Sequence, residues 1–241
     1  MMNRVVSVTG LPVLVAALLA APVFSDKIKL TSDEGAEISF DGLHRVDKSV
    51  MDEAYVKPDI NLSAYHRILI DPVEVSYKRK PMQYQGRRAS TGTGNFALTE
   101  RQMEELKSIF DEAFVQAMSD GKTWEVVESA GPDSLRVQAE LVDLVVKVPT
   151  RPSTGREDYF VSELGEVTLV LELRDSQAGE ILARGVDRQI IGRASAGRVY
   201  RATSVSARAD VRSLFDAWAK LLRLRLDQIK DLSSDPGSQG H

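Results

Sequence analysis

Apolar and polar residues alternate most regularly between Gly131 and Val148, and this stretch predicts a long β-strand. It opens with Gly-Pro-Asp-Ser, a turn signal, because proline presets φ and Asp or Ser bonds to nearby backbone. Every second residue is then apolar, at Leu135, Val137, Ala139 and Leu141, which is typical of a strand with one buried face. The phase slips at Leu141-Val142 and continues at Val142, Leu144, Val146 and Val148. We therefore expect a central strand with a β-bulge or a sharp bend.

Shorter alternating segments predict the other strands. Tyr65–Tyr77 is one of them, and its Pro72 marks an edge position or a bulge because proline cannot donate to a strand ladder. Trp124–Val127 predicts a short strand. Leu164–Asp175 and Glu180–Ile191 flank a turn at residues 176–179, which predicts a hairpin.

Two segments show helical spacing. The first begins at Thr99, which with Gln102 forms a capping box, and Gly121 is expected to end it as a left-handed cap. The second covers about Ser206–Leu232, with apolar residues on one face. The element order predicts an α+β fold, with an antiparallel-rich sheet of about five strands and two helices packed on one face.

The remaining segments are assigned by their composition. Residues 26–64 read as an extended lead-in arm, in which Phe40-Asp41-Gly42-Leu43 forms a turn whose Phe and Leu dock on the main body. Residues 65–232 form the α+β domain. The tail at 233–241 has too little apolar content to order itself.

The N-terminal residues 1–25 resemble a secretory signal peptide. Arg4 precedes an apolar run from Leu11 to Val23, and small residues allow cleavage after Ala21 or after Ser25. The alternative is an uncleaved membrane anchor, but the run is short for a hydrocarbon core of about 30 Å. Charged residues interrupt every later apolar run, so no transmembrane span is expected after cleavage.

Composition narrows the classes of function. The formal net charge is −4, which disfavours nucleic acid as a partner. The chain has no cysteine, so disulfides, a thiol nucleophile, Cys-based metal sites and an acylated N-terminal cysteine are all excluded.

Three segments carry a family resemblance: Phe40-Asp41-Gly42-Leu43, KPDINLSAYHRILIDPVEV at 57–75, and GPDSLRVQAELVDL at 131–144. Together they are similar to a family of uncharacterised bacterial secreted proteins, many of them lipoproteins, defined only as a domain of unknown function. The resemblance implies an envelope location and a small α+β domain, and it carries over no catalytic residues. Because this chain lacks the cysteine at the signal exit, a soluble periplasmic protein is expected.

Motifs that would indicate catalysis or cofactor binding are weak. Gly92-Thr93-Gly94 lacks the third glycine and the preceding strand of a dinucleotide loop. His44, His66 and His241 have no ligand-like spacing, so no metal or other cofactor is expected. No Gly-x-Ser-x-Gly motif occurs. Asp71 with Glu74, or Glu157 with Asp158, could still serve a periplasmic hydrolase whose site is assembled from distant residues.

Two basic loops are the most informative polar feature. No acid lies between Glu74 and Glu100 or between Asp187 and Asp210, and each interval holds five Lys or Arg residues. Each loop also precedes a helix N-terminus, where the free N–H groups favour anions. The candidate contact residues are Lys78, Arg79, Lys80, Arg87, Arg88, Arg193, Arg198 and Arg201.

These observations favour an exported envelope protein that acts by binding or assembly without catalysis. The basic loops would contact an anionic envelope component or a protein partner; the alternative is that they are merely solvated. Counting strands through successive hairpins places the loops at opposite ends of the sheet, which argues against one composite site. Other hypotheses are the hydrolase and a complex subunit that pairs through an exposed sheet edge. The oligomeric state is not specified by the sequence.

We expect the signal segment to be removed in a bacterial host that exports the protein. Intact-mass spectrometry should give the mass of a chain that begins at Pro22 or Asp26. A full-length mass in the membrane fraction would contradict the signal-peptide assignment and indicate a tethered domain.

Overall fold

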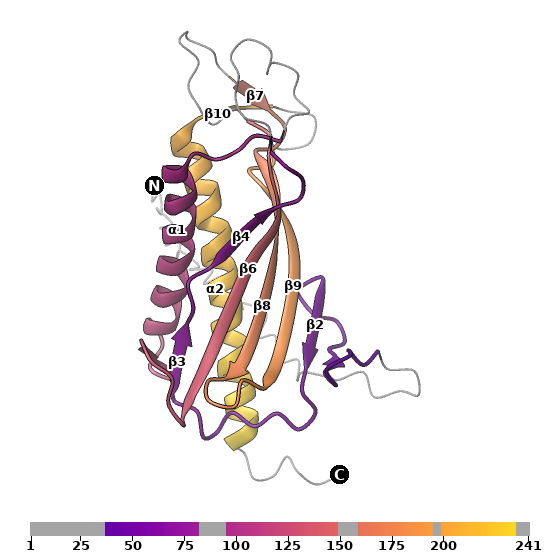
Figure 1. Cartoon of the computed structure of the whole chain (residues 1–241), viewed down its shortest axis with the longest axis vertical. Coiled ribbons are helices and arrows are strands. Elements are labelled where there is room, and N and C mark those ends of the chain that lie inside the picture. The colour runs from indigo at the N-terminus through magenta and orange to yellow at the C-terminus, as the bar shows by residue number, and fades with distance from the viewer. Residues whose placement is uncertain (1–36, 82–94, 149–158, 195–198, 235–241) are drawn as a thin grey trace, which may run out of the picture.

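The structure, a computed structural model, describes residues 37–81, 95–148, 159–194 and 199–234. In these ranges the chain forms one 8-stranded mixed sheet, one 2-stranded sheet and two long helices (Figure 1). The fold is therefore α+β, as expected. The elements are β1 His44–Arg45, β2 Glu53–Val56, β3 Arg67–Ile70, β4 Glu74–Tyr77, α1 Glu100–Ser119, β5 Glu125–Val127, β6 Ser134–Val146, β7 Tyr159–Val161, β8 Gly165–Asp175, β9 Ile181–Ile191, β10 Tyr200–Ala202 and α2 Ser204–Ser234.

The large sheet has more strands than the sequence predicts, and it is mixed. Its order is β1-β2-β9-β8-β6-β3-β5, and β4 also pairs with β6. The pairings from β1 to β6 along this order are antiparallel. Strands β3 and β4 instead pair in parallel with β6, and β3 also pairs in parallel with β5. Parallel pairs need a crossover, and α1 provides one between β4 and β5.

The predicted phase slip in the long strand is a bulge at Asp143. The β6–β8 register shifts between Val142 and Val145, and Asp143 has a φ of 55°. Leu141 and Leu144 are consequently both buried. Gly165 faces this bulge, and a Cβ placed there would lie only 2.1 Å from the Val145 carbonyl oxygen. The bulge and the glycine therefore fit each other sterically.

The predicted strand 65–77 is interrupted at Pro72, between β3 and β4. At this break Val73 is buried, and its backbone N–H bonds to the carboxylate of Asp111 on α1. Burial raises the pKa of Asp111 despite this bond. Arg136 and Gln138 on β6 donate to Asp71 Oδ2 at 2.8 and 3.0 Å. Proline at position 72 has no backbone N–H to donate to a neighbouring strand. Hydrogen bonds from β6 on one side and with α1 on the other hold this segment in place.

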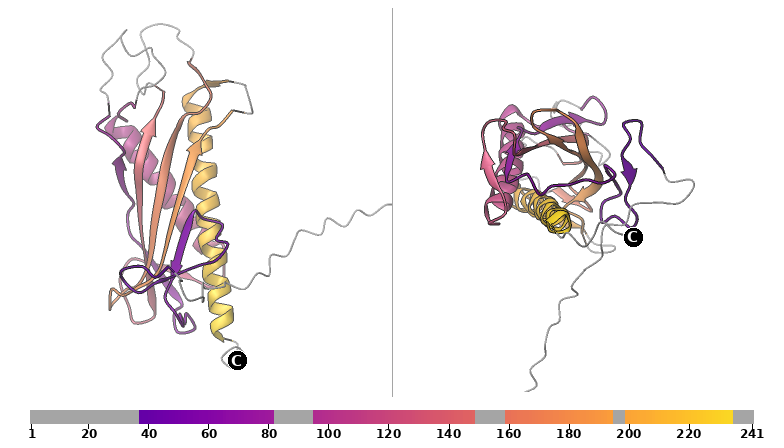
Figure 2. Two further views of the ribbon diagram at one scale, coloured as in Figure 1. Left: turned by 90° about the vertical axis from the view of Figure 1, so that its right-hand side faces the viewer. Right: turned by 90° about the horizontal axis from the view of Figure 1, so that it is seen from below.

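The two helices run in the same direction, side by side, against the sheet (Figure 2). Arg208 on α2 pairs with Glu105 on α1, and further along both helices Arg212 pairs with Glu112 at 3.3 Å. The capping box of Thr99 and Gln102 is confirmed. The expected left-handed cap at Gly121 is wrong: α1 ends at Ser119 and its C-cap, Asp120, is right-handed, with its N–H bonded to the Gln116 carbonyl.

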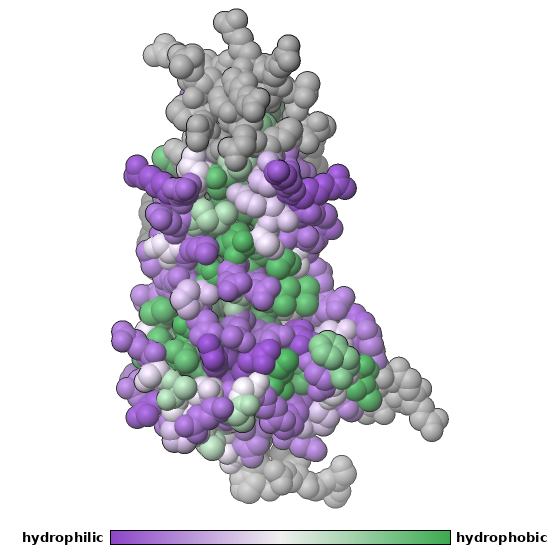
Figure 3. Space-filling view, in the orientation of Figure 1, coloured by the Kyte–Doolittle hydropathy of each residue, from purple (hydrophilic) through white to green (hydrophobic). Residues whose placement is uncertain are grey.

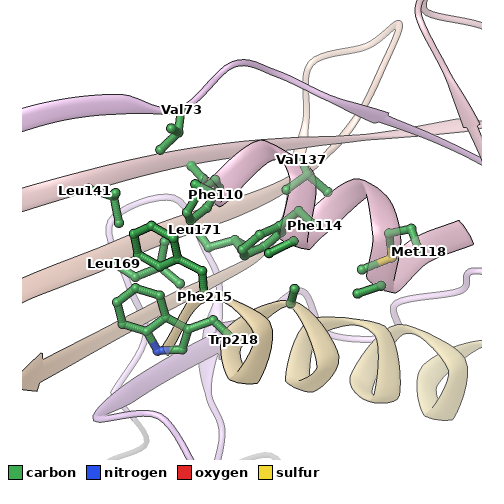
Figure 4. Packing of buried hydrophobic residues seen from close by; sticks show 14 of the residues in the cluster. Val73, Phe110, Phe114, Met118, Val137, Leu141, Leu169, Leu171, Phe215 and Trp218 are labelled. Atoms are coloured by element: carbon green, nitrogen blue, oxygen red, sulfur yellow. The ribbon is translucent and has the colours of Figure 1, made fainter. Parts of the chain in front are cut away.

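A row of aromatic rings joins the helices to the sheet. Phe110 stacks on Phe114 at 4.2 Å and meets the edge of Phe215 at 5.2 Å, and Phe215 lies 5.9 Å from Trp218. Figure 4 shows these rings between the helices and the inward residues Val137, Leu141, Leu169 and Leu171. The contacts place the main hydrophobic core between the sheet and both helices.

The arm adds β1 and β2 to the edge of the sheet beside β9. The turn at residues 40–43 is present, with a φ of 79° at Gly42. Leu43 is buried as expected. The expected docking of Phe40 is wrong, because its side chain is 94% exposed. It lies instead against the Arg184 guanidinium, 5.5 Å from the ring centroid.

Replacing Phe215 with alanine tests the aromatic row. Phe215→Ala should lower the free energy of unfolding by about 3–5 kcal/mol, because it removes buried contacts to both helices and leaves a cavity. Urea denaturation of the purified protein measures this change. Phe160→Ala is the matched control: its ring is 61% exposed, so the change should stay within about 0.5 kcal/mol. Equal losses in the two variants would contradict the assigned core.

Candidate functional site

Alternating side chains on the outer face of the sheet form a ladder of ion pairs. Glu172 accepts from Arg174 and, at 2.9 Å, from Arg184, which also pairs with Asp41 of the arm at 2.5 Å. Figure 3 shows the molecule from the side of Figure 1, with hydrophilic side chains spread over this face and hydrophobic ones between them. The central basic residues of this face are therefore already paired with acids of the same chain.

At the end of the sheet where β4 and β9 finish, two cations converge on one carboxylate. Glu166 pairs with Arg188 at 2.5 Å and with Lys78 at 3.7 Å. The hydrogen bond from Arg188 holds the pKa of Glu166 below its usual value, and Lys78 and Lys147 add to this effect through their charges. Lys147 pairs nearby with Glu163. Through Glu166 of β8, these contacts connect the end of β4 with the end of β9, and each of these strands leads into one of the two basic loops.

The candidate contact residues fall into two groups. Lys78, Arg79 and Lys80 follow β4 and are exposed, as are Arg193 after β9 and Arg201 in β10. Arg87, Arg88 and Arg198 lie outside the described residues.

The expectation that the two loops lie at opposite ends of the sheet is wrong. It assumed successive hairpins, but β4 runs parallel to β6. Lys78 therefore follows a strand that ends beside Leu144, near the end of β6, and Ile191 pairs with Gly165, which itself pairs with Val146. In Figure 1, β4, β6 and β9 all run upward, toward the end of the molecule where β7, β10 and the start of α2 lie. One composite surface is thus compatible with the topology. We call this region the basic end surface. It consists of the basic residues Lys78, Arg79, Lys80, Arg193 and Arg201 and the exposed apolar residues Phe160, Val199 and Val205.

Exposed apolar side chains lie at the same end, and the sequence reading missed them. Phe160 in β7 is 61% exposed, Val199 60% and Val205, in the first turn of α2, 73%. The β7–β10 register places Phe160 directly opposite Arg201. The sequence carries a signal for them in Tyr159-Phe160-Val161, three consecutive apolar or aromatic residues.

Of the residues considered for catalysis or metal binding, those that the structure describes have separate surroundings. Asp71 is engaged by Arg136 and Gln138, and Glu74 is exposed on β4. Glu157 and Asp158 lie outside the described residues, as does His241. Nδ1 of His66 contacts the Ala64 carbonyl at 3.1 Å. Within the described ranges, no group of three or more His, Cys, Asp or Glu residues could hold a metal ion.

A sequence profile described as "Protein of unknown function (DUF3313)" matches residues 32–222, which is most of the chain. The chain belongs to this family. The match confirms the resemblance to an uncharacterised domain family. No curated protein matches this member of the family.

Several solved structures share a remote likeness with it. A Xanthomonas campestris protein of the family DUF330 has a TM-score of 0.38 at 8% identity, over 75% of this chain and 94% of its own. PelC from Paraburkholderia phytofirmans, a dodecamer, has a TM-score of 0.35 at 9% identity, over 70% and 95%. A putative neuraminyllactose-binding hemagglutinin homolog from Helicobacter pylori has a TM-score of 0.33 at 13% identity, over 71% and 87%. Among the described residues, neither helix has the length and apolarity needed to cross a membrane.

Glu166→Gln tests the convergence of Lys78 and Arg188. At pH 7 the variant should lose about 0.5–1 kcal/mol of unfolding free energy, because two cations lose their shared partner. The folded-state pKa of Glu166 is lowered, so its stabilisation is present above the ordinary carboxyl pKa and is lost as pH falls through the lowered value. Urea denaturation should show the difference from the parent protein shrinking below pH about 4.

Glu128→Gln, an exposed carboxylate outside this cluster, is the control and should show no such difference at pH 7. A deficit of Glu166→Gln that persisted unchanged at low pH would contradict an electrostatic origin.

Proposed function

We propose that this chain is an exported protein of the bacterial envelope that acts by binding or assembly rather than by catalysis. In this proposal the basic end surface contacts an anionic component of the envelope. The observation that carries it is the parallel pairing of β4 with β6, which brings the described starts of both basic loops to one end of the molecule. The predicted signal peptide supports export to the periplasm.

Charge segregation supports an anionic partner. The chain as a whole has a net charge of −4, yet Arg79, Lys80 and Arg193 are exposed together at one end. Cations that lie near an anionic lipid surface each contribute about 1 kcal/mol, and the attraction is screened by salt. Lys78 is partly neutralised by Glu166, so it contributes less than the others.

The exposed apolar residues favour a lipid surface over a free anion. Phe160 lies opposite Arg201, and Val205 lies in the first turn of α2. Apolar side chains beside cations are characteristic of proteins that bind at the interface of an anionic bilayer. An acidic protein partner would supply the same charge, and the vesicle experiment below distinguishes the two.

Co-sedimentation with lipid vesicles tests this function. The protein should bind vesicles that contain phosphatidylglycerol, should bind phosphatidylcholine vesicles weakly, and should dissociate as salt is raised. Arg79→Glu/Arg193→Glu should reduce binding at low salt at least about tenfold, since each residue changes from attraction to repulsion. Phe160→Ala should also weaken binding at low salt, because it removes an apolar contact that salt does not screen.

The control is Lys122→Glu/Lys220→Glu, which makes the same charge change at exposed residues outside the basic end surface. Its binding should fall much less. An equal loss in both double variants would show that only net charge matters and would overturn the proposed surface. The protein could instead bind no vesicle, while the parent protein but not Arg79→Glu/Arg193→Glu captures an envelope protein. That result would assign the surface to a protein partner.

A further inference from the structure

An apolar cavity of about 410 Å³ lies between the arm, strands β8 and β9, and the C-terminal half of α2. Its walls include Leu169 and Leu171 of β8 and Trp218, Leu222 and Leu226 of α2. Figure 4 shows Trp218 with Leu169 and Leu171 between the helix and the sheet. The volume lies within the range of about 300–1,000 Å³ that is usual for sites of small molecules.

The lining residues extend along both α2 and β8, so the cavity is elongated. On α2 it extends from Trp218 to Ile229, which corresponds to about 16 Å along a helix axis. On β8 it follows Leu169, Leu171 and Leu173, or about 14 Å of strand. An unbranched aliphatic chain would make dispersion contacts with this apolar lining along its whole length.

The arm forms the third wall and is held in place by specific contacts. Met51 lies on Gly185, where a Cβ would come within 2.6 Å of its sulfur. The Asp52 backbone N–H donates to Asp187 Oδ1 at 3.3 Å, and Trp218 Nε1 donates to Asp187 Oδ2 at 2.7 Å. The buried Asp187 therefore links the arm to the helix residue that lines the cavity, so the wall is part of the fold.

The charged residues of the lining are mostly basic: Lys48, Arg184 and Arg225, with Asp47 as the acid. Arg184 is paired with Asp41 and Glu172. Within the described ranges Lys48 and Arg225 form no ion pair, and Arg225 donates to the neutral amide oxygen of Gln228 at 2.8 Å. Two cations at an apolar cavity are complementary to an anionic group at the end of an apolar chain.

We propose that this cavity binds a single-chain amphiphile with an anionic head group. The aliphatic chain lies between β8 and α2, and the head group is bound by Lys48 and Arg225. This site is separate from the basic end surface, because it uses the half of α2 that is distant from Val205 and Arg201. The two proposals can therefore fail independently.

Calorimetric titration of the purified protein tests the site, with dodecanoate and dodecyltrimethylammonium as probes below their micellar concentrations. The probes have unbranched alkyl chains of nearly equal length and opposite charges. Dodecanoate should bind saturably at one site, at least about tenfold more tightly than the cationic probe. A bromine-labelled dodecanoate should also quench Trp218 emission in a Trp124→Phe background, since these are the two tryptophans of the chain.

Variants locate the bound chain and the head group. Ala183→Phe and Ala54→Phe fill the cavity from two different strands, and each should weaken dodecanoate binding at least about tenfold. Circular dichroism shows whether each variant is folded. If one of the two variants fails to fold, the other still tests the site. Lys48→Glu/Arg225→Glu should remove or reverse the preference for the anionic probe. Lys220→Glu, on the same helix but outside the lining, should leave it unchanged.

Three results would overturn the proposal. One is the absence of saturable binding of dodecanoate. Another is unchanged affinity in both filling variants when they are folded, and the third is equal affinity for the two probes in the parent protein. Self-association of the parent protein that Ala183→Phe abolishes, without binding of either probe, would assign the cavity to a second copy of the chain.

Discussion

The packing of two parallel helices against the inward residues of β6 and β8 is the contact on which the rest of the structure depends. The row from Phe114 through Phe110 and Phe215 to Trp218 connects both helices to the sheet. After β4, helix α1 carries the chain back along the sheet to the start of β5, so β4 and β5 run in the same direction, and β3 and β6 are parallel to them. The parallel arrangement in turn determines which loops share an end of the molecule.

Helix α2 connects the two proposed sites. Its first turn lies at the end of the sheet that carries the basic loops, and its C-terminal half lines the apolar cavity. Asp187 connects the part of α2 that lines the cavity to the arm, since its carboxylate accepts from Trp218 and from the backbone of Asp52. A buried carboxylate that is satisfied on several sides fixes neighbouring elements in one arrangement. The position of the arm is thus determined by a long-range contact rather than by its own sequence.

The sequence allowed local features to be predicted well and long-range ones poorly. Alternation predicted β6 and its bulge, Pro72 predicted the break between β3 and β4, and Thr99 with Gln102 predicted the start of α1. These depend on backbone chemistry within a few residues. The parallel pairing of β4 with β6 was not predicted, because strand direction depends on where a helix crosses the sheet. The apolar cavity was also missed, since its walls come from segments more than a hundred residues apart, such as Met51 and Gly185.

The fit between Gly165 and the bulge at Asp143 has a consequence for the family as a whole. A side chain at position 165 would collide with the Val145 carbonyl oxygen, while the bulge keeps Leu141 and Leu144 on the same buried face. Neither feature can change alone without loss of packing. Across homologues, a small residue facing the bend and an extra residue within it should therefore be inherited together, as a covarying pair that marks members with this strand geometry.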